Sequence, residues 1–192
     1  QKVPQTFKPG EYKMADKKNP DVQKVIDALN TARGMELQAI SQYMVQHYTL
    51  DEMDYGKLCA YQKLIAIDEM RHAEKFAERV KELGGAPNCE KAGPIEQPQE
   101  LKQIYPFDIG MESDTIEVYD KFAKLCHECG DATTASIFED VIREEEIHLG
   151  YYQQTANHID KLGDAFLAKY AATSKHSGPV KSFVKVMEKE DF

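Results

Sequence analysis

The sequence lacks the segments that mark membrane-spanning and secreted proteins. No window of eighteen residues is apolar throughout, so no helix is expected to cross a membrane. The first residues, QKVPQTFKPG, contain no basic stretch followed by an apolar one, so no secretory signal is expected. Cysteine is also scarce, because four in 192 residues are too few for a disulfide scaffold. We therefore expect free thiols in a reducing cytoplasm.

Basic residues are also in the minority. The 24 Lys and Arg residues against 33 Asp and Glu residues give a net charge of −9, which disfavours a nucleic-acid partner and suits attraction of metal cations. Apolar residues make up 42% of the chain and charged residues 30%, which fits one domain with a core and a well-solvated surface.

Strand patterns are missing, whereas apolar residues recur with a helical period over long stretches. Asn19 and Asp131 are placed to cap the first and fourth helices, and Gly84-Gly85 is a strong stop for the second. Residues 86–107 carry four prolines and no apolar period, which predicts a long connection. The expected helices span residues 20–48, 55–83, 108–129, 132–162 and 164–172.

These elements predict an all-α fold. Two helical hairpins joined by a long crossover connection would form an antiparallel four-helix bundle, followed by a short fifth C-terminal helix. Helices of about thirty residues are roughly 45 Å long and need partners along their whole length, which a bundle provides. We expect an irregular N-terminal extension at residues 1–19, the bundle domain at residues 20–172 and an irregular tail at residues 173–192.

One set of residues occurs twice, once in each half of the chain. In each copy, Gly-Met-Glu is followed by a Tyr seven residues after the Glu, by a second Glu 33 residues after the first, and by a His three residues later. The first copy is Glu36, Tyr43, Glu69 and His72, and the second is Glu112, Tyr119, Glu145 and His148. Chance explains a single Glu-x-x-His well, but not two with equal offsets to a preceding Glu.

The repeated side chains indicate a site for two metal ions. A Glu and a His three residues apart on a helix share one face, and here that face is otherwise apolar. An ionised carboxylate on such a face is costly unless it is paired or bound to metal. Four carboxylates and two imidazoles that leave open positions are the ligands that Fe(II) and Mn(II) prefer. Glu117 and Glu144 are rival ligands, but neither keeps the repeated spacing.

Three other features allow more than one interpretation. Tyr43 and Tyr119 lie about two turns beyond their Glu, where each could bond a ligand carboxylate, donate electrons or simply pack. Met70 points away from the metal pair, as a packing residue or as an axial haem ligand. Cys126 and Cys129 form a lone C-x-x-C, which is a weak zinc or redox signal and fits free thiols near a helix end.

Several segments resemble the bacterioferritins, above all those of sulfate-reducing bacteria. The similar segments are Ile67–Glu74 (IDEMRHAE), residues 30–85 with Glu36-Leu37 and Gln42-Tyr43, and Arg143–His148 (REEEIH). The resemblance covers about residues 22–172 and implies a ferritin-like bundle that assembles, through twofold dimers, into a 24-subunit cage. It also implies a ferroxidase that oxidises Fe(II) with O₂ or H₂O₂ at an intrasubunit di-iron site and stores the product as ferric mineral.

The resemblance further implies roles for single residues. Two iron ions per subunit would be held by terminal ligands Glu36 and Glu112, bridging ligands Glu69 and Glu145, and imidazoles His72 and His148. Met70 from two subunits would clamp one haem-type iron porphyrin, and an electron-donor protein would reduce the stored iron. A rubrerythrin-like di-iron peroxidase is the alternative, although it would normally need a second C-x-x-C. A DNA-protecting cage is disfavoured by the net charge.

Overall fold

Four long helices account for most of the structure, a computed structural model that describes residues 20–97, 99–176 and 181–188. The helices are α1 (Pro20–Glu52), α2 (Gly56–Glu82), α3 (Leu101–Glu128), α4 (Ala132–Leu162), α5 (Asp164–Leu167) and α6 (Phe183–Met187). The described residues form no strand beyond an isolated bridge between Tyr55 and Ala171. None of these helices is both long and apolar enough to cross a membrane. The predicted all-α bundle is confirmed.

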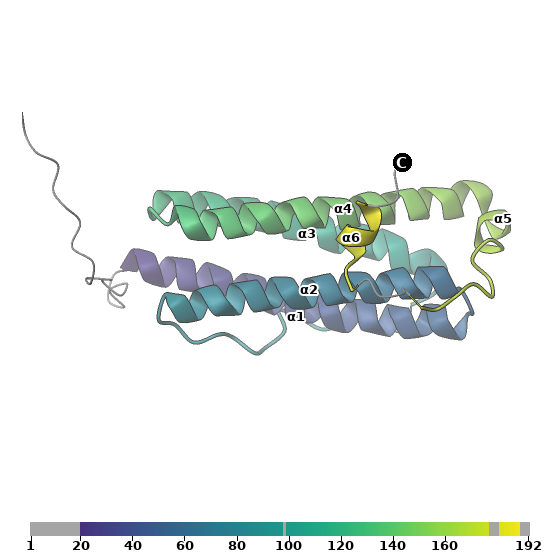
Figure 1. The fold of residues 1–192 in the computed structure, drawn as a ribbon, viewed down its shortest axis with the longest axis horizontal. Coiled ribbons are helices and arrows are strands. Elements are labelled where there is room, and N and C mark those ends of the chain that lie inside the picture. The colour runs from purple at the N-terminus through teal and green to yellow at the C-terminus, as the bar shows by residue number, and fades with distance from the viewer. Residues whose placement is uncertain (1–19, 98, 177–180, 189–192) are drawn as a thin grey trace, which may run out of the picture.

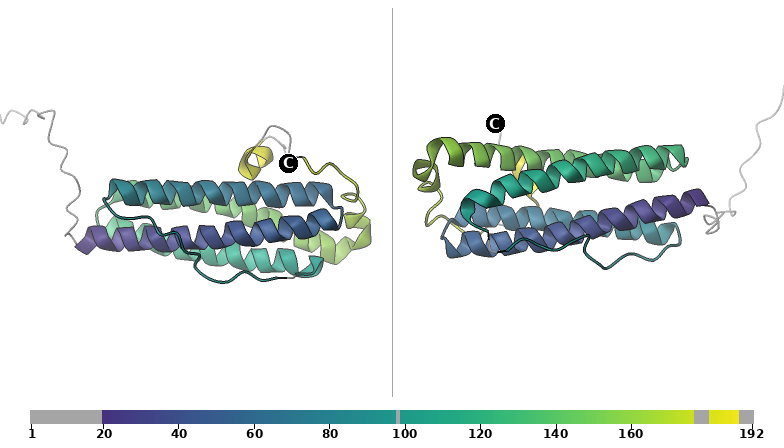
Figure 2. Two further views of the ribbon diagram at one scale, coloured as in Figure 1. Left: turned by 90° about the horizontal axis from the view of Figure 1, so that it is seen from below. Right: turned by 180° about the vertical axis from the view of Figure 1, so that it is seen from behind.

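The long helices form two antiparallel pairs, α1 with α2 and α3 with α4, which lie along each other (Figures 1 and 2). The crossover between α2 and α3 runs along α1, where Ala92 N donates to Gly34 O at 2.8 Å and Gln38 Nε2 donates to Pro94 O at 2.9 Å. A Cβ atom at Gly34 would lie 3.2 Å from Glu90 O, so a glycine there lets the crossover approach the helix.

The bounds of the first and third helices differ from the prediction. The first helix continues past residue 48 to Glu52, and the chain turns at Asp54, which has a φ of 62°. The third helix begins at Leu101 rather than at residue 108, since Gln103 Oε1 accepts a hydrogen bond from Glu100 N at 2.8 Å and fixes the first turn. The prediction places Pro106 in the connection, but it lies inside α3 near its start.

The other predicted stops are confirmed. Gly84 follows α2 with a φ of 81°, and Gly130 follows α3 with a φ of 75°, so both use the left-handed region that favours glycine. The Asp131 side chain caps α4 by accepting a hydrogen bond from Thr134 N at 2.9 Å. The predicted cap Asn19 lies outside the described residues.

The C-terminal part requires a correction. The fifth helix is shorter than predicted, because α5 ends at Leu167 and turns follow it. The tail expected to be irregular contains α6, whose five residues pack across α2 and α4 (Figure 1). A helix this short shows no periodicity in the sequence and is stabilised by tertiary contacts, which explains why the prediction was wrong there.

The core consists of two apolar clusters with a layer of polar residues between them. Along α2, residues 58–66 belong to one cluster and residues 76–83 to the other, with Glu69 and His72 between them. The order is reversed along α4, where residues of the second cluster at 135–141 precede Glu145 and residues of the first at 152–159 follow His148. The sequence therefore places its repeated polar residues at the middle of the bundle, sealed at both ends by apolar packing.

Phe76 tests the packing beside this layer. Its side chain is fully buried, and its ring centroid lies 5.4 Å from that of Tyr119 and 5.1 Å from that of Phe138. Phe76→Ala is expected to lower the free energy of unfolding by about 3–5 kcal/mol, because it removes apolar contacts and leaves a cavity. Denaturant unfolding of the apo protein measures this, and exposed Lys124→Ala should change it by no more than about 0.5 kcal/mol. Equal losses for both variants would contradict the packing.

Candidate metal centre

All six repeated Glu and His side chains meet in the polar layer. Each is at most 2% exposed: Glu36, Glu69, His72, Glu112, Glu145 and His148. Their ligating atoms form two overlapping groups, each within 4.8 Å: Glu36, Glu69, His72 and Glu145, and Glu69, Glu112, Glu145 and His148. Only Glu69 and Glu145 belong to both groups. Two cations could therefore share these two carboxylates while each has one further Glu and one His.

The two imidazole rings have the same orientation relative to the carboxylates of Glu69 and Glu145. His72 Nδ1 lies 2.9 Å from Glu69 Oε2 and 3.0 Å from Glu145 Oε1. His148 Nδ1 lies 3.0 Å from Glu145 Oε2 and 3.1 Å from Glu69 Oε1. Each ring thus presents Nδ1 to both shared carboxylates, and the ring centroids are 6.1 Å apart. This arrangement places a carboxylate pair between two imidazoles, as a dimetal site needs.

The hydrogen bonding of the buried carboxylates is a second observation that supports a pair of metal ions here. Glu69 Oε1 and Glu145 Oε1 are buried oxygens that make no hydrogen bond, although an imidazole Nδ1 lies 3.1 and 3.0 Å from them, respectively. Buried carboxylate oxygens without a partner are costly, and coordination of a cation would satisfy them. Carboxylate and imidazole donors, with no thiolate among them, match Fe(II) or Mn(II) better than structural zinc.

Both tyrosines of the repeat bond a Glu of this cluster, but each bonds the Glu of the other half. Tyr43 Oη donates to Glu112 Oε1 at 2.6 Å, and Tyr119 Oη donates to Glu36 Oε1 at 2.5 Å. Both tyrosines are buried. Glu36 and Glu112, each of which belongs to one group only, are called the outer carboxylates. Each is oriented by a phenol from the opposite hairpin, and these hydrogen bonds connect the two hairpins through the site.

Burial acts strongly on the outer carboxyl groups. It raises the pKa of Glu36 and of Glu112 well above the usual range, and the nearby charges of Glu145 and Glu69 raise both further. The phenol hydrogen bonds oppose this shift without cancelling it. Both outer carboxyl groups therefore retain protons to unusually high pH until a cation arrives.

The pKa values of the two imidazoles and of Glu145 shift in opposite directions. Burial disfavours charge on the rings, but nearby carboxylates outweigh it and raise the pKa of His72 and of His148 well above the usual range. Burial also opposes ionisation of Glu145, yet the two imidazoles lower its pKa below the usual range. Without metal the buried cluster thus neutralises its own charge through protons on the imidazoles and the outer carboxyl groups.

The rival ligands lie elsewhere. Glu117 is 69% exposed and pairs with Lys121 on the surface of α3. Glu144 lies at the rim, 31% exposed, with its Oε2 3.1 Å from His72 Nε2. The hydrogen bond with His72, followed by the one from Lys75, lowers the pKa of Glu144 to about 2.

Sequence reasoning missed the groups behind the imidazoles. Asp68 Oδ2 lies 3.7 Å from His148 Nε2, as Glu144 lies behind His72. Each directly precedes a shared Glu in the sequence, so an acidic residue at this position belongs to both copies of the repeat. That shared position was a readable signal.

Met70 and the cysteines are separate from the cluster. Met70 is 52% exposed on α2, consistent with a side chain that points away from the metal ligands. Cys126 is fully buried in the core, Cys129 is the C-cap of α3, and both thiols are free.

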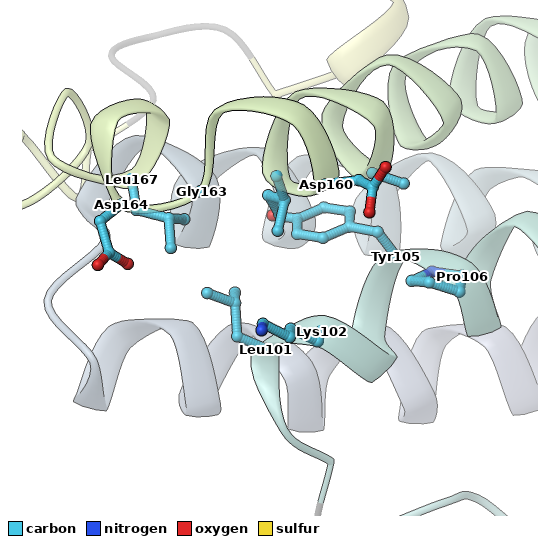
Figure 3. A pocket seen from close by; sticks show the side chains of 10 residues that line it. Leu101, Lys102, Tyr105, Pro106, Asp160, Gly163, Asp164 and Leu167 are labelled. Carbon is cyan, nitrogen blue, oxygen red and sulfur yellow. The ribbon is translucent and has the colours of Figure 1, made fainter.

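A cavity of about 340 Å³ lies at one end of the bundle, between the start of α3 and the end of α4 with α5 (Figure 3). Leu101, Tyr105 and Leu167 line it, with Asp160 and Asp164 among its polar residues. It contains none of the six repeated ligands, so it is not the metal centre.

Comparison with known proteins agrees with this geometry. The ferritin-like domain model matches residues 26–165. The bacterioferritin of Desulfovibrio desulfuricans is 54% identical over 172 residues, which cover 89% of this chain and 96% of that protein. The chain belongs to the bacterioferritins. It is therefore an iron-storage protein of the ferritin-like family, as the resemblance to bacterioferritins of sulfate reducers predicted.

Solved bacterioferritin structures superpose on the bundle. That of D. desulfuricans, which describes a diiron site in different catalytic states, has a TM-score of 0.83 at 53% identity and covers 86% of this chain and 97% of its own. That of Rhodobacter capsulatus has a TM-score of 0.76 at 31% identity and covers 81% and 98%. The latter has a metal-free dinuclear site and haem iron in a crystallographic special position.

Metal binding should depend on pH. The raised pKa values of His72, His148, Glu36 and Glu112 mean that a cation must displace protons from the site. Affinity for Co(II) should therefore rise from roughly pH 5.5 to 7.5, about tenfold per unit for each displaced proton. Calorimetry in buffers of different ionisation enthalpy measures the released protons. A binding enthalpy independent of the buffer would contradict this charge state.

Proposed function

We propose that this bacterioferritin is a ferroxidase that oxidises Fe(II) at the dimetal cluster and stores the ferric product. Glu36 and Glu112 would be terminal ligands, Glu69 and Glu145 bridging ligands, and the remaining ligands would be His72 and His148. The observation that carries the proposal is that only Glu69 and Glu145 are common to both ligand groups. Two Fe(II) ions held on shared carboxylates are close enough to deliver two electrons to one oxidant.

The chain's own groups supply the proton and charge balance of this reaction. Each of two Fe(II) ions loses one electron. O₂ that takes both electrons and two protons leaves as H₂O₂, whereas H₂O₂ that does so leaves as two waters. Protons displaced from the imidazoles and outer carboxyl groups on Fe(II) binding are available locally, and the four carboxylates offset the charge of the ferric product.

Removal of a shared carboxylate tests the site. Glu69→Ala or Glu145→Ala should abolish rapid Fe(II) oxidation, because either change deprives both cations of a ligand, while the assembly should remain intact. The initial rate of absorbance increase after Fe(II) addition measures oxidation, and gel filtration measures assembly. Exposed Glu117→Ala is the matched carboxylate control and should retain the rate. Undiminished rates in both site variants would refute the assignment.

The exposed Met70 supports a haem proposal. We propose that Met70 from two subunits binds one haem-type iron porphyrin across a twofold interface, since a thioether is a known axial ligand. Haem iron in a crystallographic special position in the R. capsulatus relative fits a group shared by two subunits. Met70 is not among the buried residues of α2, so a second copy could reach its side chain.

Met70→Ala should remove the Soret band of the purified protein and leave the oxidation rate intact, because the side chain lies outside the dimetal cluster. Met53→Ala, which also changes an exposed methionine, is the control and should keep the band. A full Soret band in Met70→Ala would refute the ligand assignment.

The assembly and its partners follow as further proposals. We infer a 24-subunit cage built from twofold dimers, a cytoplasmic location, and an electron-donor protein, because release of ferric iron requires reduction. The rubrerythrin-like peroxidase gains no support from Cys126 and Cys129. The first is buried in the core and the second ends a helix, so they offer no exposed pair of thiols for a separate redox centre.

A further inference from the structure

The two imidazoles of the cluster differ in what lies behind them. The distal nitrogen of His148, Nε2, is buried, makes no hydrogen bond, and faces Asp68 Oδ2 at 3.7 Å. The distal nitrogen of His72 lies 3.1 Å from Glu144 Oε2. Each imidazole therefore faces the carboxylate that precedes the shared Glu of the other half, so the pseudo-twofold relation of the ligands extends one step outward.

The pseudo-twofold relation does not extend to the solvent exposure of these two carboxylates. Glu144 is 31% exposed and accepts a hydrogen bond from Lys75 Nζ at 2.9 Å, and Lys75 is itself 40% exposed. Asp68 is 1% exposed. The dimetal cluster therefore has an open end at Glu144 and a closed end at Asp68.

The closed end is covered by residues 181–188, which we call the C-terminal segment and which contain α6. Phe183 N and Val184 N both donate to Asp68 Oδ2, at 2.7 and 3.2 Å. Arg71 Nη1 donates to the other oxygen, Asp68 Oδ1, at 2.8 Å. The carboxylate is thus held on both sides, and its Oδ2 is directed at His148 by backbone amides from the far end of the chain.

Packing fixes the C-terminal segment in this place. The Phe183 side chain is fully buried, and its ring centroid lies 6.0 Å from the His148 ring, 4.8 Å from the Tyr151 ring and 5.3 Å from the Tyr61 ring. Ser182 is 3% exposed, and its Oγ accepts a hydrogen bond from Lys185 N at 3.3 Å. The segment spans α2 and α4, the two helices that carry the imidazoles (Figure 1).

We propose that Asp68 is a positioning residue for His148 and that the C-terminal segment holds Asp68 in place. The inference rests on the dimetal site proposed above. An Asp68 carboxylate that faces Nε2 favours the tautomer with its proton on Nε2, in which Nδ1 is free to bind a cation, and it raises the basicity of Nδ1. The segment lies beyond residue 165, where the match to the ferritin-like domain model ends.

Variants that keep only one of the two cation sites make the test specific. Glu36→Ala should leave the cation site that contains His148, and Glu112→Ala should leave the one that contains His72. Titration with Co(II), followed by its visible absorption, then gives the affinity of each site without any oxidation assay. Asp68→Asn should weaken Co(II) binding about 10–100-fold in the Glu36→Ala background and leave it unchanged in the Glu112→Ala background.

Two further variants separate Asp68 from the segment. A chain ending at His176 lacks the segment and should weaken the same site as Asp68→Asn, and combining both changes should weaken it no further. Exposed Lys185→Ala keeps the backbone donors and should leave both sites unchanged. Glu144→Gln, the matched change at the open end, should act only in the Glu112→Ala background.

The outcomes are distinct. Equal weakening of both sites by Asp68→Asn, or additive losses for Asp68→Asn and the truncation, would overturn the inference, because each would indicate general loosening or independent action. Unchanged affinity in the truncated chain would also overturn it. If the unsubstituted protein takes up no pair of Co(II) ions, the dimetal proposal itself fails, which is a different result. Gel filtration and thermal melting confirm that each variant is folded and assembled.

Discussion

The structure depends on burying four carboxyl groups and two imidazoles in the middle of a bundle, between two apolar clusters. Such a cluster is tolerated only if its charge is balanced and its polar atoms have partners. Here protons on the imidazoles and on the outer carboxyl groups provide the balance without metal, and a pair of cations can replace them. The two apolar clusters on either side exclude water and keep the ligands in place.

The crossed tyrosine contacts follow from helix geometry. Tyr43 lies seven residues after Glu36, about 10.5 Å along the helix, too far for a hydrogen bond within one helix. The carboxylate within its reach belongs to Glu112 on α3, and the Tyr119–Glu36 contact is the reciprocal case. The sequence allowed a phenol bonded to a ligand carboxylate as one of three roles, and it did not indicate which carboxylate, because that choice depends on how the two hairpins pack against each other.

Local signals account for what could be predicted and what could not. The long helices show a helical period and caps along their own length, and the six candidate ligands share equal offsets, so the sequence indicated both. The start of α3 was not, because Pro106 suggests a break although the helix includes it. The C-terminal helix was not either, since its hydrogen-bond acceptor, Asp68, lies 115 residues away from Phe183. Elements held mainly by distant partners leave little local pattern.

The internal repeat is kept where the cations would lie and lost where the hairpins face different surroundings. Gly34 touches the crossover, while its counterpart Gly110 has open space. Met70 and its counterpart Glu146 are both exposed, so neither is constrained by the ligands. Asp68 is bound by backbone amides of the C-terminal segment. These hydrogen bonds depend on the position of that segment, because they involve none of its side chains directly. One pseudo-symmetric site can thereby acquire two unlike ends without any change in its ligands.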